Sequence, residues 1–134
     1  MEKKLHKKIK QILNSEHIFV YHIKDVPDTG ARVCDFIVCN KGKFIAIEAK
    51  VIKKKIENFE KDIQSAIEKR LTSSQQAYRL KLLKSGANYL VYAFVYDDEG
   101  IDITSTNGIL YIVSYELENG DIKCKVSLKS GLKL

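Results

Sequence analysis

The chain has 134 residues, of which 45% are apolar and 30% charged, and this fits one packed domain over residues 1–134. No apolar run is long enough to cross a bilayer, and the chain does not begin with a secretory signal. We therefore expect a cytoplasmic or other intracellular protein, encoded by a cell, a virus or a phage, with no membrane partner. The three cysteines include no CxxC pair, which argues against a disulfide framework or a zinc site, and the net charge of +6 is compatible with a polyanionic partner.

The first part of the chain predicts one helix and three strands. We expect, in order, a helix at residues 5–13, a strand at 18–23, a loop at 24–32, a strand at 33–39, a turn at 40–43 and a strand at 44–50. Leu5, Ile9 and Leu13 follow helical spacing with lysines on the other face, whereas the strands are short apolar runs between turn residues. Asn40-Lys41-Gly42-Lys43 is a strong turn signal and predicts that the strands on either side of it form a hairpin.

The second part predicts two helices followed by three strands. We expect helices at residues 51–70 and 74–84, a strand at 88–96, and strands at 109–117 and 122–128 joined by a hairpin turn. Apolar residues recur at three- or four-residue steps in the first helix, and Thr72 or Ser73 could cap the second. Gly86 ends that helix, and Glu118-Asn119-Gly120-Asp121 is a clear hairpin signal. The order predicts an α/β or α+β domain, a mixed sheet with helices packed on it and a C-terminal β-hairpin.

The hairpin of residues 33–39 and 44–50 carries the residues that suggest chemistry. Glu48 and Lys50 project from one face of their strand because side chains alternate, while Ala49 points away. Asp35 lies on the neighbouring strand and comes beside them if the register is favourable. Two carboxylates and one ammonium group would then meet on an otherwise apolar hairpin, where charges are costly unless they pair or bind an ion.

These residue types match the needs of phosphodiester hydrolysis. A hard divalent cation relieves the repulsion between two carboxylates, and magnesium suits such a site. A cation held there can acidify a water molecule and stabilise charge on a phosphate, and a nearby lysine can stabilise the transition state. Taken alone, however, a Glu-x-Lys triplet in a lysine-rich chain fits an exposed strand end equally well.

The wider sequence around this hairpin resembles a known group of nucleases. Asp35-Phe36-Ile37-Val38, followed by Lys43-Phe44-Ile45-Ala46-Ile47-Glu48-Ala49-Lys50, resembles the D…(D/E)xK signature of PD-(D/E)XK nucleases. Leu71-Thr72-Ser73-Ser74-Gln75, a helix, Gly86 and the strand Tyr89-Leu90-Val91-Tyr92 are similar to the VRR-NUC family of virus-type replication-repair nucleases. RecU-type and archaeal Holliday-junction resolvases share the same core. The resemblance implies a restriction-endonuclease-like αβββαβ core with a mixed central sheet flanked by helices.

The resemblance also implies roles for individual residues. It makes Asp35 and Glu48 metal ligands, the backbone carbonyl of Ala49 a further metal contact, and Lys50 the catalytic lysine. Gln75 matches a glutamine that lies close to the active site in the family. A carboxylate of the N-terminal helix often completes such sites, and Glu2 is the candidate, although a solvated helix start explains it equally well. The implied cofactor is Mg²⁺ or Mn²⁺.

Two departures from the family pattern concern structure more than chemistry. Cys34 stands where the family usually has proline. The segment 51–70 is longer than the usual link between the catalytic lysine and the glutamine-containing helix. Its apolar stripe fits core packing, with a dimer contact or a DNA-facing flap as the alternatives.

The function implied is that of a metal-dependent endonuclease acting on DNA, selective for branched structures such as Holliday junctions, in replication, recombination or repair. A homodimer is expected, because one small domain has little surface for a large duplex. The alternative is a non-catalytic nucleic-acid-binding or assembly domain on a nuclease-like fold. Candidate phosphate contacts, most of which also fit ordinary surface positions, are Arg32, Lys41, Lys43, Lys53, Lys54, Lys55, Arg70 and Arg79.

Overall fold

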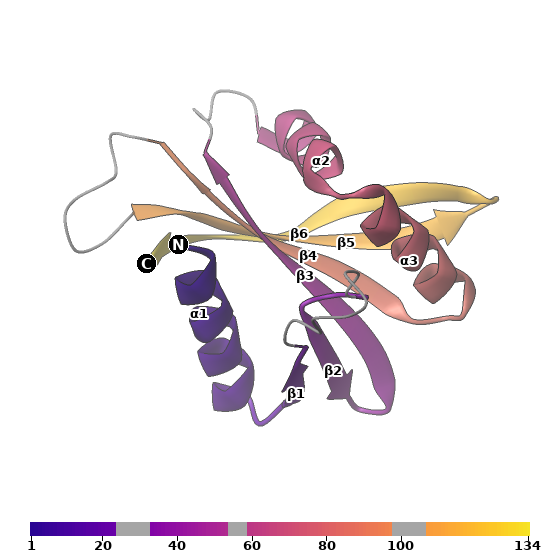
Figure 1. Ribbon diagram of the computed structural model, residues 1–134, viewed down its shortest axis with the longest axis horizontal. Helices are drawn as coiled ribbons and strands as arrows, with labels where there is room; N and C mark the ends of the chain where they lie inside the picture. Colours follow the sequence, from indigo (N-terminus) through magenta and orange to yellow (C-terminus); the bar gives the residue numbers. More distant parts are fainter. Residues whose placement is uncertain (24–32, 54–58, 98–106) are drawn as a thin grey trace.

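A computed structural model describes residues 1–23, 33–53, 59–97 and 107–134 of the chain. Within these residues the elements, in chain order, are α1 (Glu2–Ser15), β1 (Phe19–His22), β2 (Phe36–Asn40), β3 (Lys43–Lys53), α2 (Phe59–Arg70), α3 (Ser73–Lys84), β4 (Asn88–Tyr96), β5 (Asn107–Glu118) and β6 (Asp121–Lys133). Figure 1 shows them as one sheet with helices on both faces. The prediction of an α+β domain is therefore confirmed.

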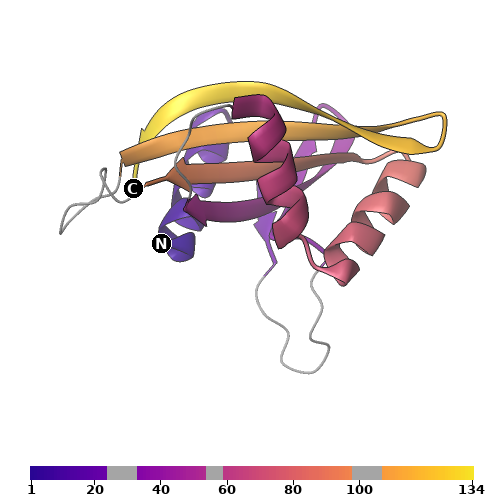
Figure 2. The ribbon, with the colours of Figure 1, turned by 90° about the horizontal axis from the view of Figure 1, so that it is seen from above.

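The sheet has six strands in the order in which they occur along the chain. Every neighbouring pair is antiparallel except β3 and β4, which are parallel and are connected through α2 and α3. A parallel pair needs such a crossover, because the chain must return to the same end of the sheet. Figure 2 shows α2 and α3 in front of the sheet and α1 behind it.

Two tight turns fix the register of the antiparallel hairpins. Asn40 pairs with Lys43 across the β2–β3 turn, and Glu118 pairs with Asp121 across the β5–β6 turn. The central residues of both turns have positive φ: 52° and 77° at residues 41 and 42, and 52° and 83° at residues 119 and 120. Turns of this kind match the twist of the flanking strands, and Asn and Gly adopt them at low cost. Both predicted hairpins are confirmed.

The core consists of one apolar layer on each face of the sheet. Leu5, Ile9 and Leu13 of α1 pack against Phe36 and neighbouring residues on one face. On the other face, α2 and α3 cover buried residues from β3, β4 and β5, among them Ile52, Tyr89, Val91 and Tyr111. Because β3 and β4 lie in the middle of the sheet, their side chains are buried on both faces. The sequences of these strands are therefore almost continuously apolar.

The prediction of one helix over residues 51–70 is wrong in its first part. Strand β3 continues to Lys53, with Val51 and Ile52 opposite Phe94 and Val95 of β4, and α2 begins at Phe59. Ile52 is fully buried in the sheet. Its position in the sequence fits both the apolar stripe of a helix and an apolar strand. Because Val51 and Ile52 are β-branched and lie beside the parallel strand β4, they favour the strand.

The remaining boundaries differ by smaller amounts. Strand β4 has the predicted bounds, and α3 is capped by Thr72, one of its two predicted caps. Strand β6 continues past residue 128 to Lys133, pairing with β5 throughout apart from an irregularity at Ile112 and Val113. None of the helices in the described ranges is both long and apolar enough to span a membrane.

The packing predicts which cysteines react with alkylating agents. Cys34 is 1% exposed, and its burial, reinforced by the nearby Glu48 carboxyl, raises the pKa of the thiol to about 12. Cys39 is exposed on β2. Because the thiolate is the reacting species, iodoacetamide at about pH 8 should modify Cys39 rapidly and leave Cys34 unmodified in the folded protein.

Peptide mass spectrometry after a timed reaction measures both positions. The same reaction in urea, where both thiols are accessible, is the control. Equal rates at Cys34 and Cys39 under native conditions would contradict the packing described for β2 and β3.

Candidate active site

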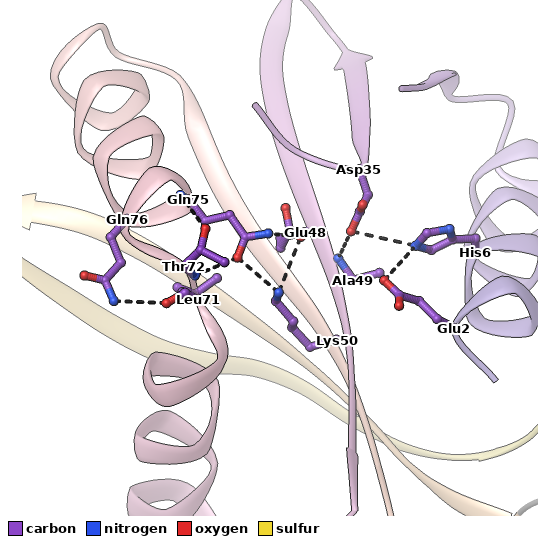
Figure 3. A network of polar contacts seen from close by, with 10 residues as sticks. All are labelled: Glu2, His6, Asp35, Glu48, Ala49, Lys50, Leu71, Thr72, Gln75 and Gln76. Carbon is purple, nitrogen blue, oxygen red and sulfur yellow. Dashed lines mark hydrogen bonds and ion pairs between the residues drawn. The ribbon is translucent and has the colours of Figure 1, made fainter. Parts of the chain in front are cut away.

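The residues of the predicted site come from three separate parts of the fold. Asp35 immediately precedes β2, Glu48 and Lys50 lie two residues apart on β3, and Gln75 lies in the first turn of α3. Figure 3 shows two groups of polar contacts on either side of β3, one around Gln75 toward α3 and one around Asp35 toward α1. The structure therefore brings together all four predicted side chains.

Asp35 is held at the point where β2 leaves the edge of β3. Its backbone N–H donates to the Ile47 carbonyl at 3.0 Å, and its own carbonyl accepts from the Ile23 N–H at 2.8 Å. Its side chain is 2% exposed, and Oδ2 accepts a hydrogen bond from the Ala49 N–H at 2.7 Å. In a strand the N–H and C=O of one residue point toward the same neighbouring strand. The Ala49 carbonyl therefore points toward the same side of β3 as its N–H, the side on which Asp35 lies. A metal contact of this carbonyl next to Asp35 requires that orientation.

The Glu48 side chain, which is also buried, lies close enough to affect the ionisation of Asp35. Burial alone would raise the pKa of Asp35. Its contacts with His6, with the Ala49 N–H and with Glu48 favour the charged form more strongly, and they hold the pKa of Asp35 below its ordinary value. The site thus keeps a carboxylate in a place from which water is largely excluded.

Gln75 joins Glu48 and Lys50 on the other side of β3. Its Nε2 donates to Glu48 Oε1 at 3.0 Å, and its Oε1 accepts from Lys50 Nζ at 3.1 Å. The same Oε1 accepts from the Thr72 N–H at 2.9 Å, while the Thr72 hydroxyl accepts from the Gln75 N–H at 3.1 Å. This capping box fixes the Gln75 side chain at the helix start. Lys50 Nζ is thereby held 3.7 Å from Glu48 Oε1.

His6 extends the network toward α1 and was not predicted from the sequence. Its Nε2 lies 3.7 Å from Asp35 Oδ2 and 3.8 Å from Glu2 Oε1, too far for hydrogen bonds. Its ring packs edge-on against Phe36, with centroids 5.3 Å apart. The available sequence signal was the position of His6 four residues after Glu2 and beside the buried Leu5 stripe, which places it on the sheet-facing side of α1.

The donor set around His6 fits a divalent cation. Ligand atoms of Glu2, His6 and Asp35 all lie within 4.8 Å of one another. The His6 Nε2 is buried and has no hydrogen-bond partner among the described residues, although it faces two carboxylate oxygens. A cation among these three atoms would bind all of them. An imidazole among the carboxylates suits Mg²⁺ less well than a transition-metal ion, and Mn²⁺ is the transition-metal ion that shares the preference of Mg²⁺ for carboxylates.

The predicted phosphate contacts have different surroundings. Lys41, Lys43 and Lys53 are exposed at the ends of β3, whereas Arg32, Lys54 and Lys55 lie outside the described residues. Arg70 is exposed and donates to the Ala66 carbonyl at 3.0 Å.

Arg79 is not available to a phosphate, and its prediction as a DNA contact is wrong. The residue is 5% exposed, and its two terminal nitrogens donate to the two oxygens of Glu68 at 2.8 Å each. The guanidinium also lies over the Tyr115 ring, 4.9 Å from its centroid. A planar cation paired in this way joins α2, α3 and β5.

Comparison of the chain with protein-family models, curated proteins and solved structures found no match in any of the three. The resemblance to VRR-NUC nucleases therefore rests on the motifs of the sequence itself.

The position of Arg79 predicts a stability effect without a binding effect. Arg79→Ala should lower the free energy of unfolding by about 2 kcal/mol, because it removes a charged double hydrogen bond and leaves Glu68 unpaired. Urea denaturation measures the change. The salt dependence of DNA binding should stay at the wild-type value, and a reduced salt slope would show that Arg79 reaches a phosphate after all.

The donor set predicts which residues bind Mn²⁺ in the absence of nucleic acid. Asp35→Asn should abolish Mn²⁺ binding, and His6→Ala should weaken it at least about ten-fold. Loss of a residue that only supports a metal ligand can already lower the affinity by that factor. Glu2→Gln should have a smaller effect, because the Glu2 side chain is 59% exposed.

Isothermal titration calorimetry with Mn²⁺ and then Mg²⁺ measures these affinities. His17→Asn is the matched control, because His17 is exposed in a positive-φ turn that asparagine tolerates. Unchanged Mn²⁺ affinity in His6→Ala would remove His6 from the metal site.

Proposed function

We propose that the protein is a metal-dependent endonuclease that hydrolyses DNA phosphodiester bonds. The observation that carries the proposal is the joining of Asp35, Glu48 and Lys50 in one buried polar network, with Gln75 between the last two. Such a network is costly to bury unless the groups pair or bind an ion. It is also the set of residues that the D…(D/E)xK resemblance assigns to catalysis.

The order of elements supports the same proposal. Helix α1 and the three antiparallel strands β1–β3 are followed by helices and then by β4, parallel to β3. This agrees with the restriction-endonuclease-like αβββαβ core that the resemblance implies. The strand that carries Glu48 and Lys50 pairs with β4 on one edge, and on its other edge β2 ends opposite Ile47, so that Asp35 takes over the Ala49 N–H.

The chemistry divides among the residues of the network. Asp35 would hold Mn²⁺ or Mg²⁺ together with His6 and Glu2, whose ligand atoms lie close to it. The resemblance adds Glu48 and the Ala49 carbonyl to this set. When bound, the ion would acidify a water molecule and offset the charge of the phosphate.

Lys50 Nζ has a separate role in the proposal. Gln75 and Glu48 hold it against one side of the site, so its charge is already in place when negative charge develops on the phosphate oxygens. Gln75 acts as a positioning residue, because its contacts are with Lys50 and Glu48. A fixed ammonium group needs little reorganisation during the reaction.

Branched DNA as the preferred substrate and a homodimer as the active form also belong to the proposal. Both come from the resemblance to junction-resolving nucleases. The exposed Lys41, Lys43 and Lys53 support a nucleic-acid partner, because they extend positive charge beyond the site.

The proposal predicts metal-dependent cleavage that needs Lys50 and Glu48. Labelled single-stranded, duplex, flap and four-way-junction DNA would be incubated with Mg²⁺, Mn²⁺ or EDTA. We expect cutting by the wild type with Mn²⁺ or Mg²⁺, and a loss of about 100-fold or more in Lys50→Ala, because the transition state loses a preorganised charge. Glu48→Ala should be inactive for want of a metal ligand.

Lys125→Ala, a substitution of an exposed lysine on β6, is the matched control and should cut at the wild-type rate. Lys50→Ala should still bind DNA, as measured by anisotropy. If the wild type binds these DNAs but cuts none with either metal, the chain is a binding or assembly domain on a nuclease-like fold. Gel filtration of the same samples tests the homodimer.

A further inference from the structure

The sheet face that carries Glu48 and Lys50 also carries exposed aromatic rings. Phe19, Tyr21 and Phe44 are 65%, 59% and 44% exposed, although they lie in regular strands. Large exposed aromatics that lie close together commonly mark a binding surface, whereas isolated ones need no explanation. We propose that these rings form a platform on which unpaired bases of a single-stranded nucleic acid stack beside the active site. This inference rests on the proposed function.

The strand register places the three rings on one face. Phe19 lies opposite Cys39, and Cys39 lies opposite Phe44, so one cross-strand row presents two rings with a small side chain between them. Tyr21 lies opposite Ile37 in the next row, two residues along β1. Directly opposed residues point to the same side of a sheet, and Ile37 packs into the core layer beneath α2 and α3. The rings are therefore on the α2–α3 face.

This part of that face is not covered by the helices of the described residues. Figure 1 shows α2 and α3 over the other half of the sheet, away from β1 and β2, and α1 lies on the opposite face. Tyr21 and Glu48 are about 10 Å apart across two strand spacings and about 7 Å along the strands. A single-stranded nucleic acid whose bases stack on the rings would thus place a phosphate near Lys50 within a few nucleotides of the stacked bases.

The charges and the shape of the surface favour a nucleic acid. Glu48 is the only acidic residue in β1, β2 and β3, and the exposed Lys41 and Lys43 adjoin Phe44. Phe44 also lines a hollow of about 640 Å³ beside the α3–β4 connection, together with the exposed residues Ser85 and Asn88. The Ser85 hydroxyl donates to the Lys81 carbonyl at 2.8 Å, so it would meet a ligand as an acceptor. Rings, lysines and side-chain hydrogen-bonding groups together are what single-strand-binding surfaces use.

A second copy of the chain fits this surface less well. Strand β1 is one of the two edge strands of the sheet that the described residues form, and pairing of two such edges would be the simplest way to form a dimer there. It has only four residues, Phe19–His22, and such short edge strands resist pairing. The platform also adjoins the active site, so a substrate bound at the active site would extend over the platform.

The chain has no tryptophan, so one substitution creates a unique fluorescent reporter. Phe19→Trp would be titrated with an oligothymidine of about 12 nucleotides, within the span of known single-strand sites. The same DNA as a duplex with oligoadenine is the second arm, and EDTA prevents cleavage. We expect quenching by the single strand and little by the duplex, because only unpaired bases can stack on the ring. Leu128→Trp on β6, another exposed apolar position, is the matched control and should not respond.

Affinities of alanine variants test the same surface without the reporter. Phe19→Ala and Tyr21→Ala should each weaken single-strand binding at least about five-fold, the scale of one lost base–ring stack, and leave the salt slope unchanged. Lys43→Ala should instead reduce that slope by about 0.7, the value for one phosphate contact on a single strand. Tyr21→Phe keeps the ring and should bind like the wild type.

Equal losses on single strand and duplex, or no loss in either ring variant, would overturn the platform. A wild-type dimer that Tyr21→Ala converts to a monomer would also overturn it, because the surface would then be an interface between copies. Metal-free binding is independent of cleavage. Stacking without cleavage would count against the nuclease alone, and cleavage without any effect of the rings would count against the platform alone.

Discussion

The burial of two carboxyl groups at one point of the sheet is the constraint on which the rest of the site depends. Asp35 and Glu48 are both almost fully buried, and Glu48 is close enough to affect the ionisation of Asp35. Taking such groups out of water costs several kcal/mol for each charge unless other groups compensate. The compensation comes from different elements. The Ala49 N–H and His6 lie against the Asp35 carboxyl, while Gln75 and Lys50 lie against the Glu48 carboxyl.

The topology of the sheet allows these partners to meet. The chain enters β2 at Asp35, where the Ala49 N–H binds the carboxylate at a place where a regular strand would offer a backbone carbonyl. The parallel crossover returns through α2 and α3, and it places the start of α3 over Glu48 and Lys50. A hairpin connection from β3 to β4 would have supplied no helix start at this position. The fold thus surrounds β3 with donors on both sides.

Local sequence patterns could predict the helices and strands and the placing of Glu48 and Lys50 on one face of β3, because these features depend on residues close in the sequence. The Asn-Gly and Lys-Gly turns fix two registers, and alternation alone places Glu48 and Lys50 on one face. Longer-range features escaped prediction. His6 joins the site only because α1 packs behind β2, which no local pattern shows.

Arg79 and Ile52 show the same limit in other elements. The sequence around Arg79 has the character of a helix surface, and the partner that buries Arg79 is Glu68, eleven residues earlier on another helix. Ile52 fits a helical stripe and a strand equally, so only its pairing with Val95 decides between them. In each case the deciding contact is tertiary, and it overrides a local preference.

The two ends of the network differ in exposure, and under the proposed function this difference suits a reaction on a phosphate. At the α1 end, Glu2 is largely exposed, so a cation can reach His6 and Asp35 from solvent. At the other end, Lys50 is mostly buried and lies beside the start of α3, whose backbone dipole adds partial positive charge. A phosphate placed between the two ends would meet positive charge from both sides. The carboxylates beneath it remain neutralised by groups that the fold already holds in place, so little of the protein needs to move when the substrate binds.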